Sequence, residues 1–139
     1  MLSQSQLDIL KAFFEREGEI IAGYLFGSFA KGTDSHSSDV DVALLLADDT
    51  GPDTHTDLAG RYQGNLSELL GREVDVVILN EAPPFLKFQI FRHGQRLFDR
   101  DQKRSGHFIA VSLIEYFDFE PLKRSMEERI IQRLKEQPS

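Results

Sequence analysis

The spacing of apolar residues along the chain predicts alternating helices and strands. Near the N-terminus apolar residues recur at helical spacing, which predicts an amphipathic helix over residues 5–16 that stops near Gly18. Apolar runs rich in β-forming residues predict buried strands over 20–26, 40–46 and 74–79, and a short edge strand is expected over 95–98. The second of these strands carries acidic residues at its front and apolar residues behind them.

Turn-forming residues and further helical patterns separate the strands. Residues 27–38 are small, polar and glycine-bearing, which predicts a tight turn and then a loop, and a second loop is expected over 49–56. Helices are predicted over 58–70 with Gly71 as its cap, from Pro83-Pro84 to about Arg92 with Gly94 as its cap, and over 103–135, where Pro121 should kink or divide the helix. The expected fold class is therefore α/β, a small mixed β-sheet with flanking helices, in a single domain over 1–139 with a C-terminal helical segment at about 103–136.

Composition narrows the class of protein. The chain has 139 residues, enough for one hydrophobic core, and its 40% hydrophobic and 28% charged residues are typical of a soluble globular protein. Without cysteine it has neither disulfides nor thiolate metal ligands. No secretory signal and no membrane-spanning apolar stretch is found, so we expect a cytoplasmic protein with no membrane partner.

The charge balance argues against one class of partner. A net charge of −7 disfavours general nucleic-acid binding, which depends on basic residues that neutralise phosphates. It does not exclude a single nucleotide, since a few local donors and metal ions can hold one triphosphate.

The first element of candidate chemistry is the pair Gly27-Ser28, directly after a predicted strand. A strand that turns at once into a helical turn presents free backbone N–H groups, which suit phosphate oxygens. Glycine lets the backbone approach the phosphate closely, and the Ser28 hydroxyl can donate to the same oxygens or cap the helical turn. Ser38 is either a further phosphate contact or a turn residue, and Lys31 is either a phosphate contact or a solvated side chain.

The second element is a set of aspartates. Asp39 and Asp41 lie two residues apart on a strand, so their side chains share one face and repel each other unless a cation lies between them. Their oxygen ligands favour Mg²⁺, or Mn²⁺, and Asp75 on the third strand can join them for a two-metal in-line displacement. The alternative for Asp39 and Asp41 is a solvated strand end, and Glu73 has the strand parity to replace Asp75 as the third acid.

The chain contains a Gly-Ser pair, an Asp-x-Asp motif ten residues later and a further aspartate on a following strand. This combination resembles the motif of the DNA polymerase beta nucleotidyltransferase superfamily. The motif covers residues 25–46 and 74–79. Within the superfamily, the segment Gly-Ser-Phe-Ala-Lys-Gly-Thr…Ser-Asp-Val-Asp-Val-Ala and the chain length are similar to those of the minimal nucleotidyltransferase antitoxins. The resemblance implies the polymerase-beta-like fold and an adenylyltransferase that uses ATP and magnesium to modify a tyrosine of a HEPN-type RNase toxin, its partner in a hetero-oligomeric toxin–antitoxin complex.

The resemblance also implies roles for individual residues. Gly27 and Ser28 match the phosphate-binding pair, and Asp39 and Asp41 match the acids that bind both metal ions. Asp75 matches the third acid, which binds one ion and helps to deprotonate the attacking hydroxyl. Relatives often have arginine at the position of Lys31, and lysine cannot reproduce the bidentate phosphate contact of arginine.

Two other functions remain open. Small-molecule nucleotidyltransferases usually carry an extra helical domain, whereas only some sixty residues follow the third predicted strand here, so a protein partner is expected to supply the missing wall of the site. Transfer to a small molecule or RNA is one alternative. The other is an antitoxin that neutralises its partner by occlusion alone, although an idle site has no physical need for clustered acids.

Overall fold

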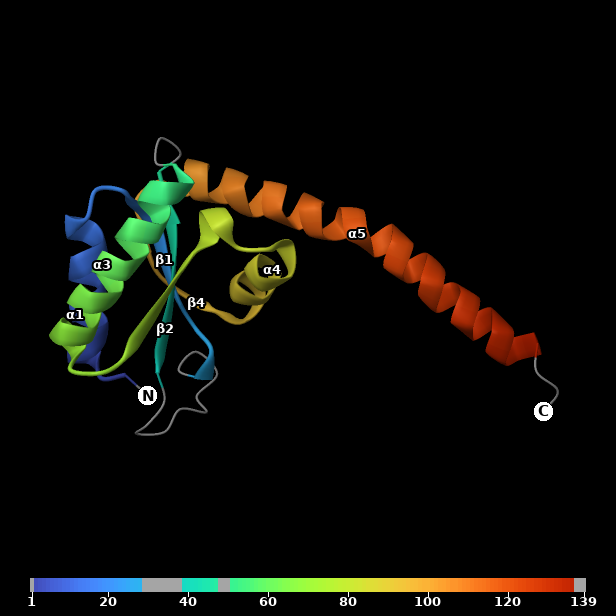
Figure 1. Cartoon of the computed structure of the whole chain (residues 1–139), viewed down its shortest axis with the longest axis horizontal. Coiled ribbons are helices and arrows are strands. Elements are labelled where there is room, and N and C mark those ends of the chain that lie inside the picture. The colour runs from blue at the N-terminus through green and yellow to red at the C-terminus, as the bar shows by residue number, and fades with distance from the viewer. Residues whose placement is uncertain (1, 29–38, 48–50, 137–139) are drawn as a thin grey trace.

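The fold is built on a mixed four-stranded sheet, as predicted (Figure 1). The structure is a computed structural model, and it describes residues 2–28, 39–47 and 51–136. The strands are β1 (Ile20–Phe26), β2 (Val40–Leu46), β3 (Val74–Ile78) and β4 (Gln95–Asp99), in the order β3-β2-β1-β4. β1 is antiparallel to both β2 and β4, whereas β2 and β3 are parallel. The edge strand predicted over 95–98 is therefore confirmed as β4.

One face of the sheet is covered by α1 (Gln4–Arg16) and α3 (Pro52–Leu70), as Figure 1 shows. A capping box between Ser3 and Gln6 starts α1, and Gly71 ends α3 in the left-handed conformation that favours glycine. Phe13, Phe14 and Tyr62 are buried between these helices and the even-numbered residues of β2. This side holds the larger part of the hydrophobic core.

The opposite face is covered by α4 (Pro84–His93) and the first part of α5 (Gln102–Glu136). Alternate residues of the central strands, including Tyr24 and Leu45, pack here with Ile90 of α4, and Phe91 contacts Phe108 of α5 edge to face. Because strand side chains alternate between faces, the odd-numbered residues of β2 point to this side. Asp41 is one of them.

Two predicted boundaries were wrong. Residues 52–56 were expected in a loop but form the first turns of α3, because Pro52 supplies the backbone angle of a helical first position and Gly51 precedes it as the N-cap. Leu79 belongs to the short 3-10 helix η1 (Leu79–Glu81) and not to β3. Gly94 ends α4 as expected, although with an extended backbone.

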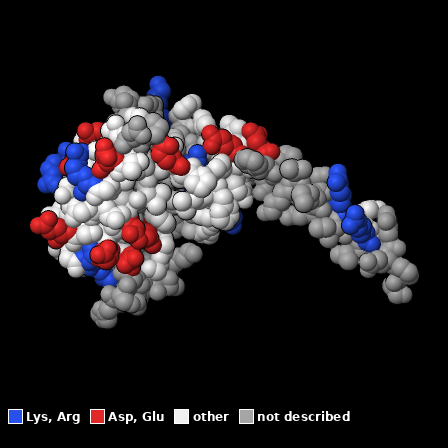
Figure 2. All heavy atoms as spheres, in the orientation of Figure 1, with Lys and Arg blue, Asp and Glu red and all other residues white. Residues whose placement is uncertain are grey.

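The C-terminal helix α5 extends far from the body of the molecule (Figure 1). It continues through Pro121, so of the two predicted outcomes the helix is not divided, and Figure 1 shows a bend part-way along its axis. Figure 2 shows acidic side chains over much of the body and basic side chains towards the far end of α5. Within the described part of the chain, no helix is long and apolar enough to cross a membrane.

Candidate active site

The sheet register brings two of the predicted acids together. Asp41 on β2 is the ladder partner of Asp75 on parallel β3, and it also lies opposite Phe26 on β1. Partners in a ladder share a face of the sheet, so Asp75, Asp41 and Phe26 form a row across three neighbouring strands. Asp39 has the same strand parity as Asp41 and precedes it at the start of β2. The row lies on the face that α4 and α5 cover.

Electrostatic repulsion within this group is visible at Asp41. Its pKa is raised above the ordinary carboxyl range, first by burial and then by the negative charges of Asp75 and Asp39. Asp41 is partly buried, whereas Asp39 and Asp75 are exposed. The three carboxylates are thus close enough to disfavour simultaneous ionisation, a cost that a bound cation would remove.

Glu73, the alternative third acid, occupies a different place in the register. Its carbonyl oxygen accepts a hydrogen bond from the Val40 N–H at 3.0 Å, directly before β3. Continuing the ladder by one residue places Glu73 beside Asp39, whereas Asp75 lies beside Asp41. Among these acids, Asp75 and Asp39 raise the pKa of Asp41.

Gly27 is required by its backbone and by its surroundings. Its φ is +71°, a left-handed conformation that residues with a Cβ rarely adopt. A Cβ at this position would also collide with the Oδ2 atom of Asp41 and would lie 3.2 Å from its Cγ. The backbone turn after β1 is therefore packed directly against the carboxylate of Asp41, which joins the predicted phosphate loop to the acid row.

The other predicted phosphate contacts can be followed only in part. Ser28 comes next after Gly27, is helical and is partly buried. Lys31 and Ser38 lie outside the described residues. The expected hydroxyl and lysine contacts with a phosphate therefore stay predictions.

Asp39, Asp41 and Asp75 are the candidate ligands of a metal ion. Among the described residues, no group of three His, Cys, Asp or Glu side chains is arranged so that it could hold a metal ion. Carboxylate oxygens are nevertheless the donors that magnesium prefers; Asp41 and Asp75 share one face of the sheet, and burial and then the charges of Asp75 and Asp39 raise the pKa of Asp41. A hard divalent cation is the ligand that this charge distribution favours.

A pocket of about 320 Å³ adjoins the acid row on the side of α4. Phe26 and Gly27 form its β1 side, and residues of α4 form the other: Phe85, Leu86, Gln89, Ile90 and His93. The sequence analysis missed this pocket. The available signal was the four-residue spacing of Phe85, Gln89 and His93, which places them along one stripe of a helix.

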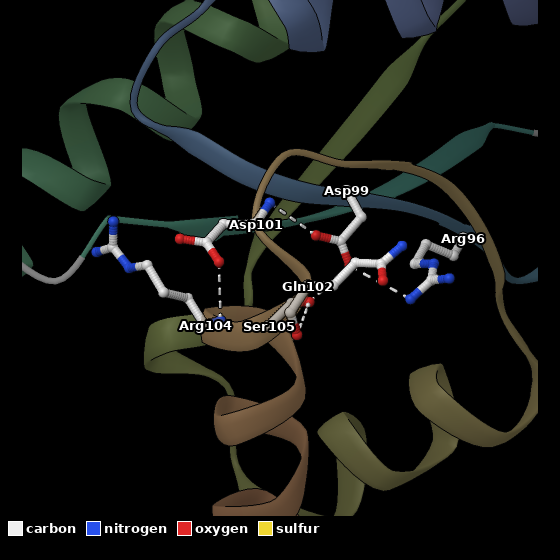
Figure 3. Close-up of polar contacts among 6 residues, drawn as sticks. All are labelled: Arg96, Asp99, Asp101, Gln102, Arg104 and Ser105. Atoms are coloured by element: carbon white, nitrogen blue, oxygen red, sulfur yellow. Dashed lines mark hydrogen bonds and ion pairs between the residues drawn. The ribbon is translucent and has the colours of Figure 1, made fainter.

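Arg96 and His55, which lie outside the motif, form ion pairs away from the acid row. Arg96 pairs with the nearly buried Asp99 at 3.2 Å, and Asp99 also accepts a hydrogen bond from the Ser105 hydroxyl (Figure 3). In the same region the Asp101 carboxylate accepts a hydrogen bond from the backbone N–H of Arg104 in the first turn of α5. His55 is buried and contacts Glu81 at 2.7 Å, a pairing that the sequence did not indicate. These contacts stabilise the junctions between elements.

Comparison with known proteins places these features in a family. The polymerase beta nucleotidyltransferase family matches residues 8–103. Protein adenylyltransferase MntA of Shewanella oneidensis is 35% identical over 94 residues, which cover 68% of this chain and 63% of MntA. The chain thus aligns with less than two thirds of that relative. A Methanocaldococcus jannaschii protein, provisionally named a protein adenylyltransferase, is 28% identical over 106 residues, 76% of this chain and 71% of that protein.

Solved structures share the fold over nearly the whole chain. A chain in the crystal structure of a toxin–antitoxin with AMP-PNP matches with a TM-score of 0.68 at 25% identity, covering 94% of this chain and 99% of that one. A second match is to a structure of a tri-AMPylated S. oneidensis HEPN toxin in complex with MNT antitoxin. Its TM-score is 0.64 at 23% identity, and the match covers 94% of this chain and 99% of that one. The latter similarity shows the fold alone.

Proposed function

Because the chain belongs to the polymerase beta nucleotidyltransferase family, we propose that it is a magnesium-dependent protein adenylyltransferase. It transfers AMP from ATP to a tyrosine of a HEPN-type RNase toxin and acts as the antitoxin of that protein. The observation that carries this proposal is the arrangement of Asp41, which lies opposite Asp75 and directly against Gly27.

The relatives support the choice of nucleotide and acceptor. MntA, which is 35% identical to this chain over 94 residues, is a protein adenylyltransferase. A toxin–antitoxin structure with the ATP analogue AMP-PNP matches this chain at 25% identity. A protein acceptor and ATP as donor follow by analogy with these relatives.

The roles of Gly27, Asp41 and Asp75 are supported by their positions, whereas those of Lys31 and Ser38 rest on the family resemblance alone. The N–H groups after Gly27, the hydroxyls of Ser28 and Ser38, and Lys31 bind the phosphates of ATP. Asp39, Asp41 and Asp75 hold magnesium, which neutralises phosphate charge when it is bound. The tyrosine oxygen forms a bond to the α-phosphorus, the bond from that phosphorus to the bridging oxygen breaks, and pyrophosphate leaves. Asp75 accepts the tyrosine proton as the general base.

Asp75 is favoured over Glu73 for this role by its surroundings. It lies beside Asp41 in the ladder, and its charge raises the pKa of Asp41. Both acids are exposed, so an incoming hydroxyl could reach either, and it is the position beside Asp41 that favours Asp75. Glu73, by continuation of the ladder, lies beside Asp39 instead.

The exposed side of α5 supports a protein partner. Val111, Ile114 and Phe117 recur every three residues and are 40%, 60% and 53% exposed. On the far part of α5 the described exposed charges are mainly basic, namely Arg124, Arg129, Arg133 and Lys135 against Glu128. We propose that this helix contacts the partner through an apolar patch, defined as Val111, Ile114 and Phe117, and through the basic residues beyond it.

Transfer is tested with the purified chain and a HEPN-type toxin. We expect intact-mass spectra to show AMP added to the toxin when ATP and magnesium are present, and no addition when EDTA replaces magnesium. Asp39→Asn with Asp41→Asn should give unmodified toxin, while Asp57→Asn on the exposed side of α3 should behave as wild type. AMP transfer by the double variant at the wild-type rate would contradict the proposal, and AMP found on RNA or a small molecule instead would change the acceptor.

A further inference from the structure

The pocket beside Gly27 has the position and the chemistry of a binding site for the base of the nucleotide. Gly27 packs against Asp41 of the acid row and also lines this 320 Å³ pocket, so the pocket begins directly beside the row. Phe26, the other β1 residue of the wall, is the ladder partner of Asp41. A nucleotide with its phosphates at Gly27 would have its remaining part beside this pocket.

The α4 wall of the pocket is held firmly against the sheet. The Gly94 N–H donates to the Ile90 carbonyl oxygen at 2.7 Å, and a Cβ at Gly94 would lie 2.5 Å from that oxygen and 3.2 Å from the Leu25 carbonyl oxygen. Ile90 is 1% exposed, and Phe91 packs edge to face on Tyr24 with ring centroids 5.7 Å apart. The end of α4 is therefore fixed beside the end of β1, and the stripe of Phe85, Gln89 and His93 keeps its place next to Gly27.

The stripe combines an aromatic ring with an amide. Phe85 is 63% exposed although it is a large apolar residue, so one face of its ring can receive another ring. Gln89 is partly buried in the pocket wall four residues further along α4. A side-chain amide offers one donor and one acceptor side by side, which matches N7 and the N6 amino group of adenine, and aromatic side chains stack on nucleobases.

We propose that this pocket binds the adenine ring of ATP, with Phe85 stacked on the ring and Gln89 hydrogen-bonded to its N6 and N7 edge. The inference rests on the proposed function, because it takes the phosphates to lie at Gly27. It goes beyond it by assigning the choice of base to residues of α4. Guanine carries a carbonyl oxygen where adenine has its amino group, so the same amide pairs less well with guanine.

The test is isothermal titration of the full chain with ATP, GTP and tripolyphosphate, each with magnesium. Gln89→Ala should weaken ATP binding on the order of tenfold and leave tripolyphosphate binding unchanged. Gln89→Arg should move the preference towards GTP, because a guanidinium donates hydrogen bonds to both N7 and O6 of guanine, the two acceptors on the edge that faces residue 89. Phe85→Ala should weaken ATP and GTP alike, on the order of tenfold. Gln102→Ala, at an exposed residue of α5 away from the pocket, serves as the control and should match the wild type.

The outcomes separate this inference from the function on which it rests. Wild-type protein that binds neither ATP nor tripolyphosphate would overturn both. Wild-type protein that binds ATP no better than tripolyphosphate, or Gln89 and Phe85 variants that keep wild-type affinity and base preference, would overturn the base pocket alone. Variants that keep ATP affinity and lose only AMP transfer would also overturn it, since the pocket would then receive the acceptor.

Discussion

Asp41 of β2 and Asp75 of β3 are partners in the parallel ladder, and their negative charges repel each other across it. Together with burial and Asp39, Asp75 raises the pKa of Asp41. A folded protein that binds a proton more readily than the unfolded chain loses stability as pH rises. The acid row should therefore destabilise the metal-free fold at neutral pH.

The first prediction follows from this sign. Without magnesium, the contribution of Asp41 should be most favourable below its ordinary pKa of about 4 and should decline as pH rises through its raised pKa. Asp41→Asn should flatten that decline and keep or raise the Tm at pH 7, as should Asp39→Asn with Asp41→Asn. Thermal melts across this pH range measure it, with Asp57→Asn as the control. A large loss of metal-free stability in Asp41→Asn would mean that this carboxylate has a structural role instead.

A second prediction separates the two reasons for glycine at position 27. Gly27 and Gly71 both have positive φ, at 71° and 66°, but a Cβ at Gly71 has nothing within 4 Å. Gly71→Ala should cost about 1–2 kcal/mol through backbone strain alone. Gly27→Ala should cost at least about 1 kcal/mol more, because its Cβ meets Asp41.

A double-mutant cycle tests whether the contact with Asp41 causes the extra cost of Gly27→Ala. Asp41→Ala should remove the added cost of Gly27→Ala and leave the cost of Gly71→Ala unchanged. The free energy of unfolding in urea is the measurement. Equal costs at both glycines in the wild-type background would show that the contact with Asp41 is not tight in solution.

A third prediction concerns Arg100, which joins the end of β4 to the end of α1. Its guanidinium donates to the carbonyl oxygens of Phe14 at 3.0 Å, Glu15 at 2.7 Å and Ile20 at 3.1 Å. These carbonyls lie at the end of α1 and the start of β1, where a cation also favours the helix dipole. Arg100→Ala should lower the free energy of unfolding by about 1–2 kcal/mol.

Lysine provides the matched variant for Arg100. Arg100→Lys keeps the positive charge but loses the planar set of guanidinium N–H donors. It should therefore recover only part of the free energy of unfolding that Arg100→Ala loses. The measurement is the free energy of unfolding in urea of the wild type, Arg100→Ala and Arg100→Lys. Full recovery by lysine would show that charge alone, and not the set of directed hydrogen bonds, matters here.

A fourth prediction tests the apolar patch of α5. Ile114→Asp and Phe117→Asp should each weaken binding of the HEPN-type partner about tenfold or more, because they place a charge in a desolvated contact. ATP affinity should not change, since neither residue lines the pocket at Gly27. Glu128→Gln on the same helix is a control away from the patch. Unchanged partner affinity in both aspartate variants, measured by surface plasmon resonance, would exclude this patch from the interface.

The sequence predicted the strands and most helices because their apolar patterns are strong. It also predicted which acids share a face, since strand parity depends only on spacing. It could not supply the register that puts Asp75 beside Asp41 and Glu73 beside Asp39, because ladder partners come from distant segments. The same holds for the contact of Gly27 with Asp41, the pairing of His55 with Glu81 and the α4 pocket. At Pro52 a loop was predicted because Gly-Pro is typical of turns, although proline also suits a first helical turn.

The central claim is that neutralisation of the partner is enzymatic and depends on Asp75. Asp75 is exposed on the surface of the sheet, so Asp75→Asn should leave the fold and partner binding intact while removing the general base. The measurement is intact mass spectrometry of a co-expressed HEPN-type toxin, made beside a growth assay. The account predicts AMP on a toxin tyrosine and normal growth with the wild type, and unmodified toxin with restored toxicity with Asp75→Asn. Normal growth with Asp75→Asn, while the toxin carries no AMP, would contradict it and would show that the chain neutralises its partner by occlusion.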